Sequence, residues 1–231
     1  MRKFTTKFAI KSIVRIKLST VAQTVARHLL TVQAVRLRPA DPFTWSSGWK
    51  SPIYCDNRVT LAYPEVRTYI KEALADLVRR EFPTAQVIAG VATAGIPQGA
   101  LVADALNLPY CYVRPEPKKH GMGNQIEGRI EASDNPQRVV VVEDLISTGG
   151  SSLKVVEALR QAGAEVIGMI AIFTYGFALA DQNFANANVK LACLSNYDTL
   201  IGEAQTLDYI PADTTDSLTA WRQNPAEWGK Q

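Results

Sequence analysis

The sequence predicts an α/β protein in which a parallel-type central sheet is flanked by helices. Short apolar runs rich in β-branched residues alternate with longer segments whose apolar residues recur at helical spacing, which is typical of βαβ units. Four consecutive valines, Val139 to Val142, suit a strand that is buried on both faces of such a sheet. With 231 residues and 47% hydrophobic content, the chain can build one α/β domain with a small appended lobe.

The individual elements follow from local patterns in chain order. A helix is predicted over Val21 to Val32, and aromatic, glycine and proline residues between Phe43 and Arg58 then indicate a turn-rich lid. Pro64 suits the first turn of a helix, which apolar residues at spacings of three and four extend to about Phe82. The tail, Asn196 to Trp228, carries helical patterns and is expected to pack beside the lid. Between them come strand Val87 to Ala92, helix Pro97 to Leu106, strand Tyr110 to Val113, strand Val139 to Val142 with its following helix, and strand Val166 to Phe173 as the last strand.

The most specific chemistry lies where the valine strand leads into a helix. Hydroxyls and glycines occupy this turn, namely Ser147, Thr148, Gly149, Gly150 and Ser151. Unpaired amides and the positive end of the helix dipole favour an anion there, and glycine lets the backbone approach closely. An ordinary strand-turn-helix connection with a capping serine is the alternative, which the full run EDLISTGGS disfavours.

Two acids, Glu143 and Asp144, sit at the carboxyl end of the same strand. Since carboxylates repel phosphate, the expected partners are neutral hydroxyls such as a ribose diol, or a magnesium ion held with the phosphates. The segment lacks both the Gly-Lys-Ser/Thr of a nucleotide triphosphatase loop and a GxGxxG pattern. A sugar phosphate is therefore favoured over ATP or NAD.

Three segments together resemble a known family. EDLISTGGS resembles the phosphoribosyl diphosphate (PRPP) motif of the type I phosphoribosyltransferases. YVRPEPKKHGMGNQIEG, residues 112–128, resembles the mobile catalytic loop of the orotate phosphoribosyltransferases, and FTWSSGWKSPIYCDNR, residues 43–58, resembles their N-terminal hood. The order of the three matches the family, and the likeness covers roughly residues 18–225. It implies a type I phosphoribosyltransferase fold with a small N-terminal hood, acting with Mg²⁺ on orotate and PRPP in pyrimidine (UMP) synthesis.

The resemblance also implies which residues form the site. Lys118, His120 and Asp144 are implied to be catalytic, and Ser147 is the family position that contacts orotate. No protein ligand is implied for Mg²⁺, which PRPP mainly holds. PRPP binding is implied for Arg114, Lys118, Lys119, His120, Glu143, Asp144, Leu145, Ile146, Ser147, Thr148, Gly149, Gly150 and Ser151.

The basic loop has physical properties of its own. Lys118, Lys119 and His120 lie between two prolines on one side and Gly121 and Gly123 on the other, and Arg114 precedes the prolines. The segment can therefore close over a polyanion and exclude water. A solvated surface loop with an incidental charge cluster is the alternative. The resemblance implies that the loop, residues 114–123, completes the site of the neighbouring subunit, and hence a homodimer.

The chain departs from the better-known branch of the family at several basic positions. Ser46, Ala94 and Pro115 stand where that branch has lysines, and the arginine that contacts the orotate carboxylate has no clear counterpart in residues 173–184. Candidates for this contact are Lys50, Arg58 or backbone amides. The turn VATAGIPQG, residues 91–99, is implied to bind pyrophosphate through backbone amides of residues 92–95, although tight packing of strand on helix explains its small residues equally well.

Charge and composition restrict the remaining function classes. Residues 1–17 hold six bases and no acid, so the rest of the chain carries 19 bases against 22 acids and offers no argument for nucleic-acid binding. We expect residues 1–17 to be a disordered or mis-assigned extension of a single domain, residues 18–231, with a hood over about 18–60 plus the tail and a core over about 61–195. No apolar run reaches the roughly 18–20 residues of a membrane span, and three cysteines without metal or redox spacing suit reduced thiols, so a soluble cytoplasmic protein is expected.

Three other functions fit the sequence less well. A purine or other base phosphoribosyltransferase, or a PRPP-sensing regulator that binds nucleic acid, is not expected to carry the hood and the loop together. Fusion to the decarboxylase that follows in the pathway is not expected, because the chain is too short to contain it.

Overall fold

The computed structural model describes residues 19–45, 48–114, 116, 125–131 and 134–229. Six strands form the central sheet in the order β10-β9-β8-β5-β6-β7. All neighbours run parallel except β6 and β7, which are antiparallel. The strands are β5 (Val87–Val91), β6 (Tyr110–Val113), β7 (Ile126–Glu127), β8 (Arg138–Ile146), β9 (Glu165–Thr174) and β10 (Leu191–Asn196).

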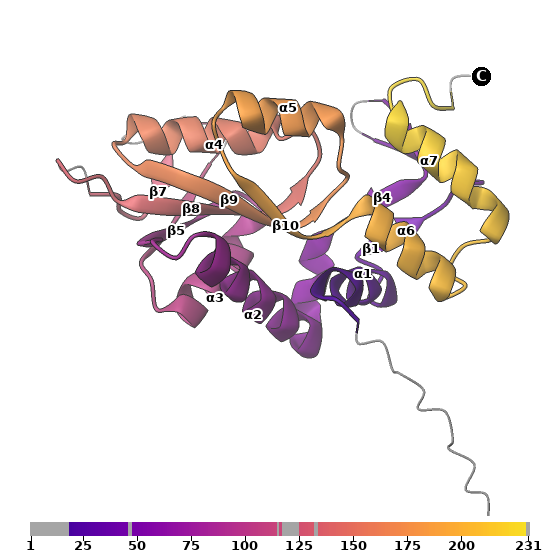
Figure 1. The fold of residues 1–231 in the computed structure, drawn as a ribbon, viewed down its shortest axis with the longest axis horizontal. Helices are drawn as coiled ribbons and strands as arrows, with labels where there is room; N and C mark the ends of the chain where they lie inside the picture. The colour runs from indigo at the N-terminus through magenta and orange to yellow at the C-terminus, as the bar shows by residue number, and fades with distance from the viewer. Residues whose placement is uncertain (1–18, 46–47, 115, 117–124, 132–133, 230–231) are drawn as a thin grey trace, which may run out of the picture.

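Helices cover both faces of this sheet. Figure 1 shows α4 (Gly150–Gln161) and α5 (Ala178–Asn186) on one face, with α2 (Pro64–Glu81) and α3 (Gly95–Leu106) on the other. The valines of β8 divide between the two resulting cores: Val140 and Val142 pack with the α2 and α3 side, whereas their neighbours Val139 and Val141 pack with the α4 and α5 side. The valine run is therefore buried on both faces, as its composition predicts.

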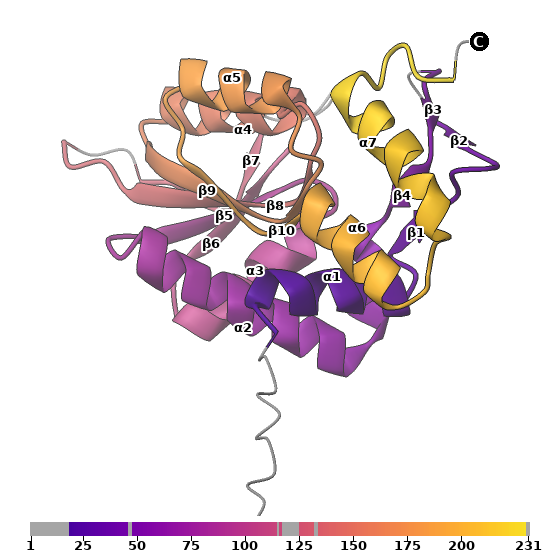
Figure 2. The same ribbon diagram turned by 45° about the vertical axis from the view of Figure 1, so that its right-hand side comes forward.

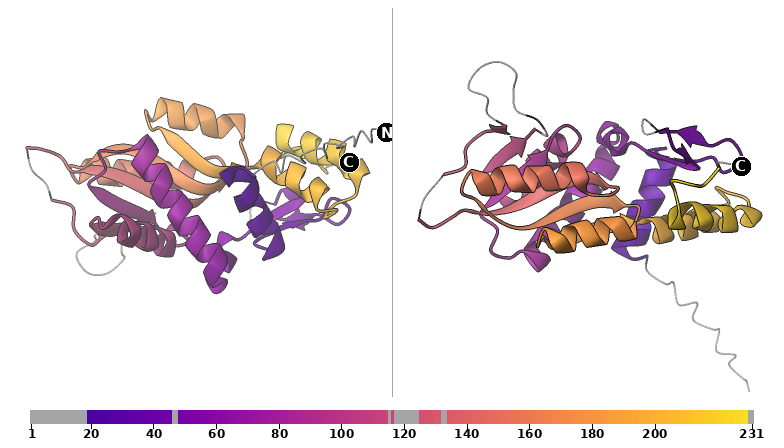
Figure 3. Two further views of the ribbon diagram at one scale, coloured as in Figure 1. Left: turned by 60° about the horizontal axis from the view of Figure 1, so that its bottom comes forward. Right: turned by 90° about the horizontal axis from the view of Figure 1, so that it is seen from above.

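A small lobe lies at one end of the sheet. Its strands form two antiparallel pairs, β1 (Val35–Leu37) with β4 (Ile53–Cys55) and β2 (Phe43–Thr44) with β3 (Lys50–Ser51). Helix α7 (Thr215–Gln223) stands beside these hood strands (Figure 2). The view from above shows the hood, α6 (Tyr197–Thr206) and α7 together at one end, with α4 and α5 over the strands (Figure 3). The remaining elements are α1 (Val21–Thr31) and the 3-10 segments η1 (Asn57–Ala62) and η2 (Ala212–Thr214).

An aromatic cluster joins the tail to the hood and to the sheet. Trp221 of α7 is completely buried, and its ring centroid lies 5.7 Å from that of Trp45 in the hood and 5.7 Å from that of Tyr175, just after β9. Phe177 and Tyr197 add further ring contacts to Trp221, at 5.6 and 5.4 Å. The C-terminal helix thereby fixes the hood against the carboxyl edge of the sheet.

The predicted elements are present, with five differences, the first of which is helix α5, where no helix is predicted. Strand β9 is not the last strand, because β10 follows and forms an edge of the sheet. The sequence of β10, LACLSN, has no β-branched residue, so β propensity alone does not predict a strand there. Helix α3 begins at Gly95 rather than Pro97, β7 is antiparallel, and β8 continues through the acids to Ile146.

The sequence predicts that the chain has no membrane-spanning segment and that its cysteines are reduced thiols. No helix in the described part of the chain is both long enough and apolar enough to cross a bilayer. All three cysteines are free thiols, and Cys111 is fully buried in the core of the α4 face.

Candidate active site

The two acids of β8 occupy different surroundings. Glu143 is only 6% exposed, and its carboxylate accepts hydrogen bonds from Ser152 Oγ at 2.8 Å and from the Asp144 backbone N–H at 3.0 Å. Because Ser152 lies in the first turn of α4, Glu143 ties the end of the strand to the start of the helix. Asp144 is partly exposed, and its backbone carbonyl accepts a hydrogen bond of 2.7 Å from Asn57 Nδ2 in η1.

Electrostatics separate the roles of the two carboxyl groups. Burial, together with the neighbouring charge of Asp144, raises the pKa of Glu143 to about 8. Burial also raises the pKa of Asp144, but the hydrogen bond with Glu143 and the nearby Arg58 guanidinium oppose that rise. Two adjacent carboxylates in one buried site resist double ionisation. The pair is therefore expected to carry one negative charge near neutral pH, located on Asp144.

Replacing Glu143 with glutamine is expected to stabilise the protein above pH 8 and to change little at pH 4. The pKa of Glu143 is raised from about 4.5 in the unfolded chain to about 8 in the fold, so its ionisation costs stability progressively across that interval. Glutamine has the same shape, is never ionised and keeps both hydrogen bonds with Ser152 reoriented. Urea unfolding should show the variant more stable by about 1–3 kcal/mol at pH 8.5. A constant difference at all pH values would contradict the buried-charge account.

The turn after β8 is shaped for an anion and is braced by α5. Gly149 adopts a left-handed conformation, φ +80°, where a Cβ would lie 2.5 Å from Cε2 of Phe184. Asn183 Nδ2 donates a hydrogen bond of 2.9 Å to the Thr148 carbonyl. No side chain caps α4 within the described structure, so its first-turn amides are available to an anion such as a phosphate.

A cavity of about 600 Å³ lies between the hood and this turn. We call it the hood cavity. It joins predicted site residues of the PRPP motif to aromatic residues that lie more than 80 positions earlier in the chain, which only the fold brings together. Its lining residues are Thr44, Trp45, Trp49, Tyr54, Cys55, Leu145, Ser147, Thr148 and Tyr175.

A second cavity, of about 420 Å³, lies where β5 and β6 end. It is lined by Ala92 and Thr93 from the turn after β5 and by Arg114 from the beginning of the basic loop, together with Ile96, Tyr112 and Glu116. The turn that resembles a pyrophosphate-binding loop and the first basic residue of the catalytic loop therefore border one space. Such an arrangement can receive a second anionic group of the same ligand.

The glycines of the turn after β5 also serve packing. A Cβ on Gly95 would lie 2.5 Å from the Val142 carbonyl oxygen, and one on Gly90 would lie 2.6 Å from both the Gly95 carbonyl oxygen and the Tyr110 hydroxyl. Helix α3 can approach β5 and β8 only because these positions lack side chains. The small residues of this turn are thus required by packing, whether or not their amides bind pyrophosphate.

Comparisons with known proteins agree with this geometry. Residues 60–194 match the family model of the phosphoribosyl transferase domain. The chain is 59% identical over 206 residues to an orotate phosphoribosyltransferase of Cytophaga hutchinsonii, covering 89% of this chain and 97% of that protein. It is 54% identical over 209 residues to the orotate phosphoribosyltransferase of Streptococcus pneumoniae, covering 90% of this chain and 98% of that protein. The chain belongs to the orotate phosphoribosyltransferase family.

A solved structure of an orotate phosphoribosyltransferase has a similar fold. The crystal structure of orotate phosphoribosyltransferase from Aeropyrum pernix superposes with a TM-score of 0.68 at 31% identity, covering 81% of this chain and 99% of that one. The predicted resemblance and the predicted type I phosphoribosyltransferase fold are thus confirmed.

The structure describes only some of the basic residues that are expected in an orotate phosphoribosyltransferase site. Arg114 lines the second cavity, with its Nη1 3.9 Å from Glu127 Oε1. Lys118, Lys119 and His120, together with Ser46 and Pro115, lie outside the described residues. The two candidates for the orotate carboxylate already have protein partners: Lys50 Nζ donates to Thr44 Oγ1 at 2.9 Å, and Arg58 pairs through two nitrogens with Asp56 at 2.7 and 2.9 Å.

Several residues of the site were not predicted from the sequence. Asn57 and Ser152 lie inside or beside the motifs and could have been noted as polar residues at otherwise apolar or helix-starting positions. The sequence around Asn183 and Tyr175 does not indicate a functional role, because a single asparagine on a helix and a tyrosine after a strand occur in many proteins. Their roles follow from the long-range contacts that the fold creates.

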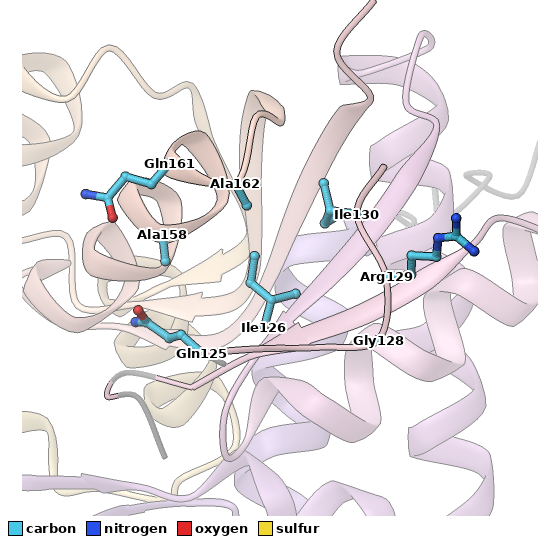
Figure 4. Close-up of a pocket in the computed structure, with 8 residues that line it drawn as sticks. All are labelled: Gln125, Ile126, Gly128, Arg129, Ile130, Ala158, Gln161 and Ala162. Atoms are coloured by element: carbon cyan, nitrogen blue, oxygen red, sulfur yellow. The ribbon is translucent and has the colours of Figure 1, made fainter. Parts of the chain in front are cut away.

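A third cavity, of about 500 Å³, lies away from all these residues. It opens at the outer edge of the sheet between β7 and the last turns of α4, where Ile126 and Ile130 face α4 and Arg129 points away (Figure 4). The phosphate turn is at the opposite end of α4, about 15 Å along a helix of this length. None of the predicted site residues lines this cavity.

Proposed function

We infer that the protein is an orotate phosphoribosyltransferase, a pentosyltransferase that converts orotate and PRPP into orotidine 5′-monophosphate (OMP) and pyrophosphate in the synthesis of UMP. The family relationship supports this reaction. The single structural observation that carries it is the hood cavity, where Ser147 and Thr148 of the PRPP motif face the aromatic residues of the hood. A phosphoribosyl group and a flat heterocycle can meet in this space.

The reaction requires electrostatic stabilisation more than a protein nucleophile. The bond from the anomeric carbon to the pyrophosphate oxygen breaks with its electron pair on pyrophosphate, and the ring nitrogen N1 of orotate supplies the pair for the new bond to that carbon. The proton that N1 carries in orotate is released to the departing pyrophosphate or to solvent. Positive charge develops on the ribose ring, which the carboxylate of Asp144 would stabilise. The amides and hydroxyls of the turn from Ser147 to Ser151 would hold the 5′-phosphate, and Arg114 would face the pyrophosphate.

The loop residues complete this proposal. Lys118, Lys119 and His120 would neutralise the departing pyrophosphate from the neighbouring subunit of a homodimer. Mg²⁺ would bind mainly through oxygens of PRPP, because phosphate and water oxygens are the hard ligands that this ion prefers. When bound, it supplies charge neutralisation of the diphosphate. We place the enzyme in the cytoplasm, where a biosynthetic enzyme of this kind meets its small-molecule substrates.

The assignment is tested by a substrate panel. Consumption of orotate should require PRPP and a divalent cation, with OMP and pyrophosphate formed in equal amounts. Uracil, adenine and hypoxanthine should react far more slowly under the same conditions. Faster turnover of adenine or hypoxanthine than of orotate would overturn the assignment.

Mixed dimers should recover activity if the loop acts on the partner's site. An Asp144→Asn parent and a Lys118→Ala parent are each expected to be nearly inactive. Random exchange of subunits makes up to about half of the dimers mixed, and each mixed dimer has one site with both residues intact, so activity should approach about one quarter of wild type. Subunit exchange is verified by native mass spectrometry of parents with different tags. Exchanged but inactive dimers would show that each loop serves its own subunit.

A further inference from the structure

Tyr175 lines the hood cavity beside the phosphate turn. It directly follows β9 at the carboxyl edge of the sheet and is only 3% exposed. Its backbone N–H donates a hydrogen bond of 3.1 Å to the carbonyl of Ile146, the residue before the phosphate turn. The position of Tyr175 is therefore fixed relative to Ser147 and Thr148.

The ring of Tyr175 is held by other aromatic rings. Its centroid lies 5.4 Å from that of Trp45, 5.5 Å from that of Phe177, and 5.7 Å from those of Phe173 and Trp221. These contacts restrict the rotamer of the side chain. A donor fixed in this way loses little conformational freedom when it binds a ligand.

The hydroxyl of this tyrosine has no hydrogen-bond partner among the described residues, whereas the hydroxyls of two other largely buried tyrosines do. Tyr197 donates to the Leu218 carbonyl at 3.0 Å, and Tyr110 donates to the Ile96 carbonyl at 2.7 Å. Unlike the indole N–H of Trp221, the Tyr175 hydroxyl is not one of the fully buried polar atoms that lack a partner, so its oxygen keeps contact with the open space of the hood cavity. Burial also raises the pKa of Tyr175 well above its ordinary value, so the hydroxyl remains a donor at any working pH.

The cavity offers neutral donors to an anionic group, namely the hydroxyls of Tyr175, Tyr54 and Thr44 beside those of the phosphate turn. Of these, the Tyr175 hydroxyl belongs to the ring that other aromatic rings hold most closely. No lysine or arginine is among its lining residues, and the indole N–H of Trp45 already donates to the Ile53 carbonyl at 3.2 Å. Orotate differs from uracil by one carboxylate, which is ionised near neutral pH. A carboxylate that enters an aromatic-lined cavity needs donors to replace its lost water.

We propose that the Tyr175 hydroxyl donates a hydrogen bond to the carboxylate of orotate and makes the enzyme specific for this base over uracil. Trp221 acts on the same interaction as a positioning residue, because its ring holds the ring of Tyr175 from the side of α7. The inference rests on the proposed function. It assigns the contact with the orotate carboxylate to Tyr175 in place of Lys50 and Arg58, whose side chains already bind Thr44 and Asp56. A hydrogen bond to a charged acceptor is about twice as strong as one between neutral groups.

The test compares two products that differ only in this carboxylate. OMP and UMP share the ribose 5-phosphate and the pyrimidine ring, and their binding to the full-length dimer is measured by calorimetry for wild type, Tyr175→Phe and Tyr197→Phe. Tyr175→Phe is expected to weaken OMP binding about 10- to 100-fold, to change UMP binding less than about threefold, and to raise the Michaelis constant for orotate but not that for PRPP.

Tyr197→Phe is the matched control from the same aromatic cluster. Its hydroxyl lies outside the hood cavity and has a protein partner, so this variant should lower Tm by about 2–4 °C and leave OMP binding unchanged. Tyr175→Phe should change Tm by less than about 2 °C, since its hydroxyl makes no hydrogen bond within the described structure and borders the open cavity.

The outcomes separate this inference from the reaction assignment. If wild type consumes orotate while Tyr175→Phe binds OMP as wild type does, the inference is overturned and the proposed function stands. Equal weakening of OMP and UMP would also overturn it, because the hydroxyl would then contact a shared group. If wild type binds neither product and consumes no orotate, the proposed function itself fails.

Discussion

Asp144→Asn is expected to lower kcat about 100-fold while changing the Michaelis constant for PRPP by less than about threefold. Asp144 is the partly exposed member of the acidic pair at the carboxyl end of β8 and is expected to carry its negative charge. Asparagine keeps the shape of this side chain but not its charge. Positive charge on the ribose ring exists only near the transition state, so the lost interaction should reduce the rate rather than ground-state binding. Single-turnover measurement of OMP formation tests this directly.

The control for this substitution is Asp76→Asn. Asp76 lies on α2, where it is largely exposed and pairs with Arg79. The same chemical change there should leave both kcat and the Michaelis constants unaltered, because exposed ion pairs contribute little. If Asp144→Asn instead raised the PRPP Michaelis constant with kcat preserved, the carboxylate would serve uniform binding of the sugar.

Trp221→Ala is expected to lower the free energy of unfolding by about 3–5 kcal/mol, the range for truncating a fully buried large aromatic side chain. Trp221 is completely buried, and its ring contacts four others from three parts of the chain. Its loss leaves a void between α7, the hood and the end of β9, where neighbouring rings cannot all move inward. Urea unfolding monitored by circular dichroism measures the effect.

Trp221→Phe separates ring packing from simple disruption. The indole Nε1 of Trp221 is buried without a hydrogen-bond partner in the described structure, so phenylalanine loses area but also removes an unsatisfied donor. A loss of no more than about 1–2 kcal/mol is expected. If alanine and phenylalanine were equally tolerated, the tail would not fix the hood, and the restricted position of Tyr175 would need another cause.

The pattern of apolar residues determined most of the fold. The four valines of β8 specify a strand buried on both faces, and alternation with helical stripes specifies a parallel sheet with helices on each side. Strand β10 escaped prediction because LACLSN lacks β-branched residues and becomes a strand only by pairing with β9. The two-residue β7 is likewise defined by its neighbour β6 rather than by its own sequence.

The chemical identity of the site also came from the sequence, because a phosphate turn, paired acids and a hood are contiguous motifs whose residue types fix what they can bind. Only the tertiary structure decided which role each residue of these motifs has. Glu143 and Asp144 are adjacent in sequence, yet Ser152 and burial make one a structural brace and leave the other to bear charge. Tyr175 and Trp221 acquire their roles solely from contacts between segments distant in the chain, since pKa, burial and hydrogen-bond satisfaction depend on three-dimensional neighbours that no local pattern encodes.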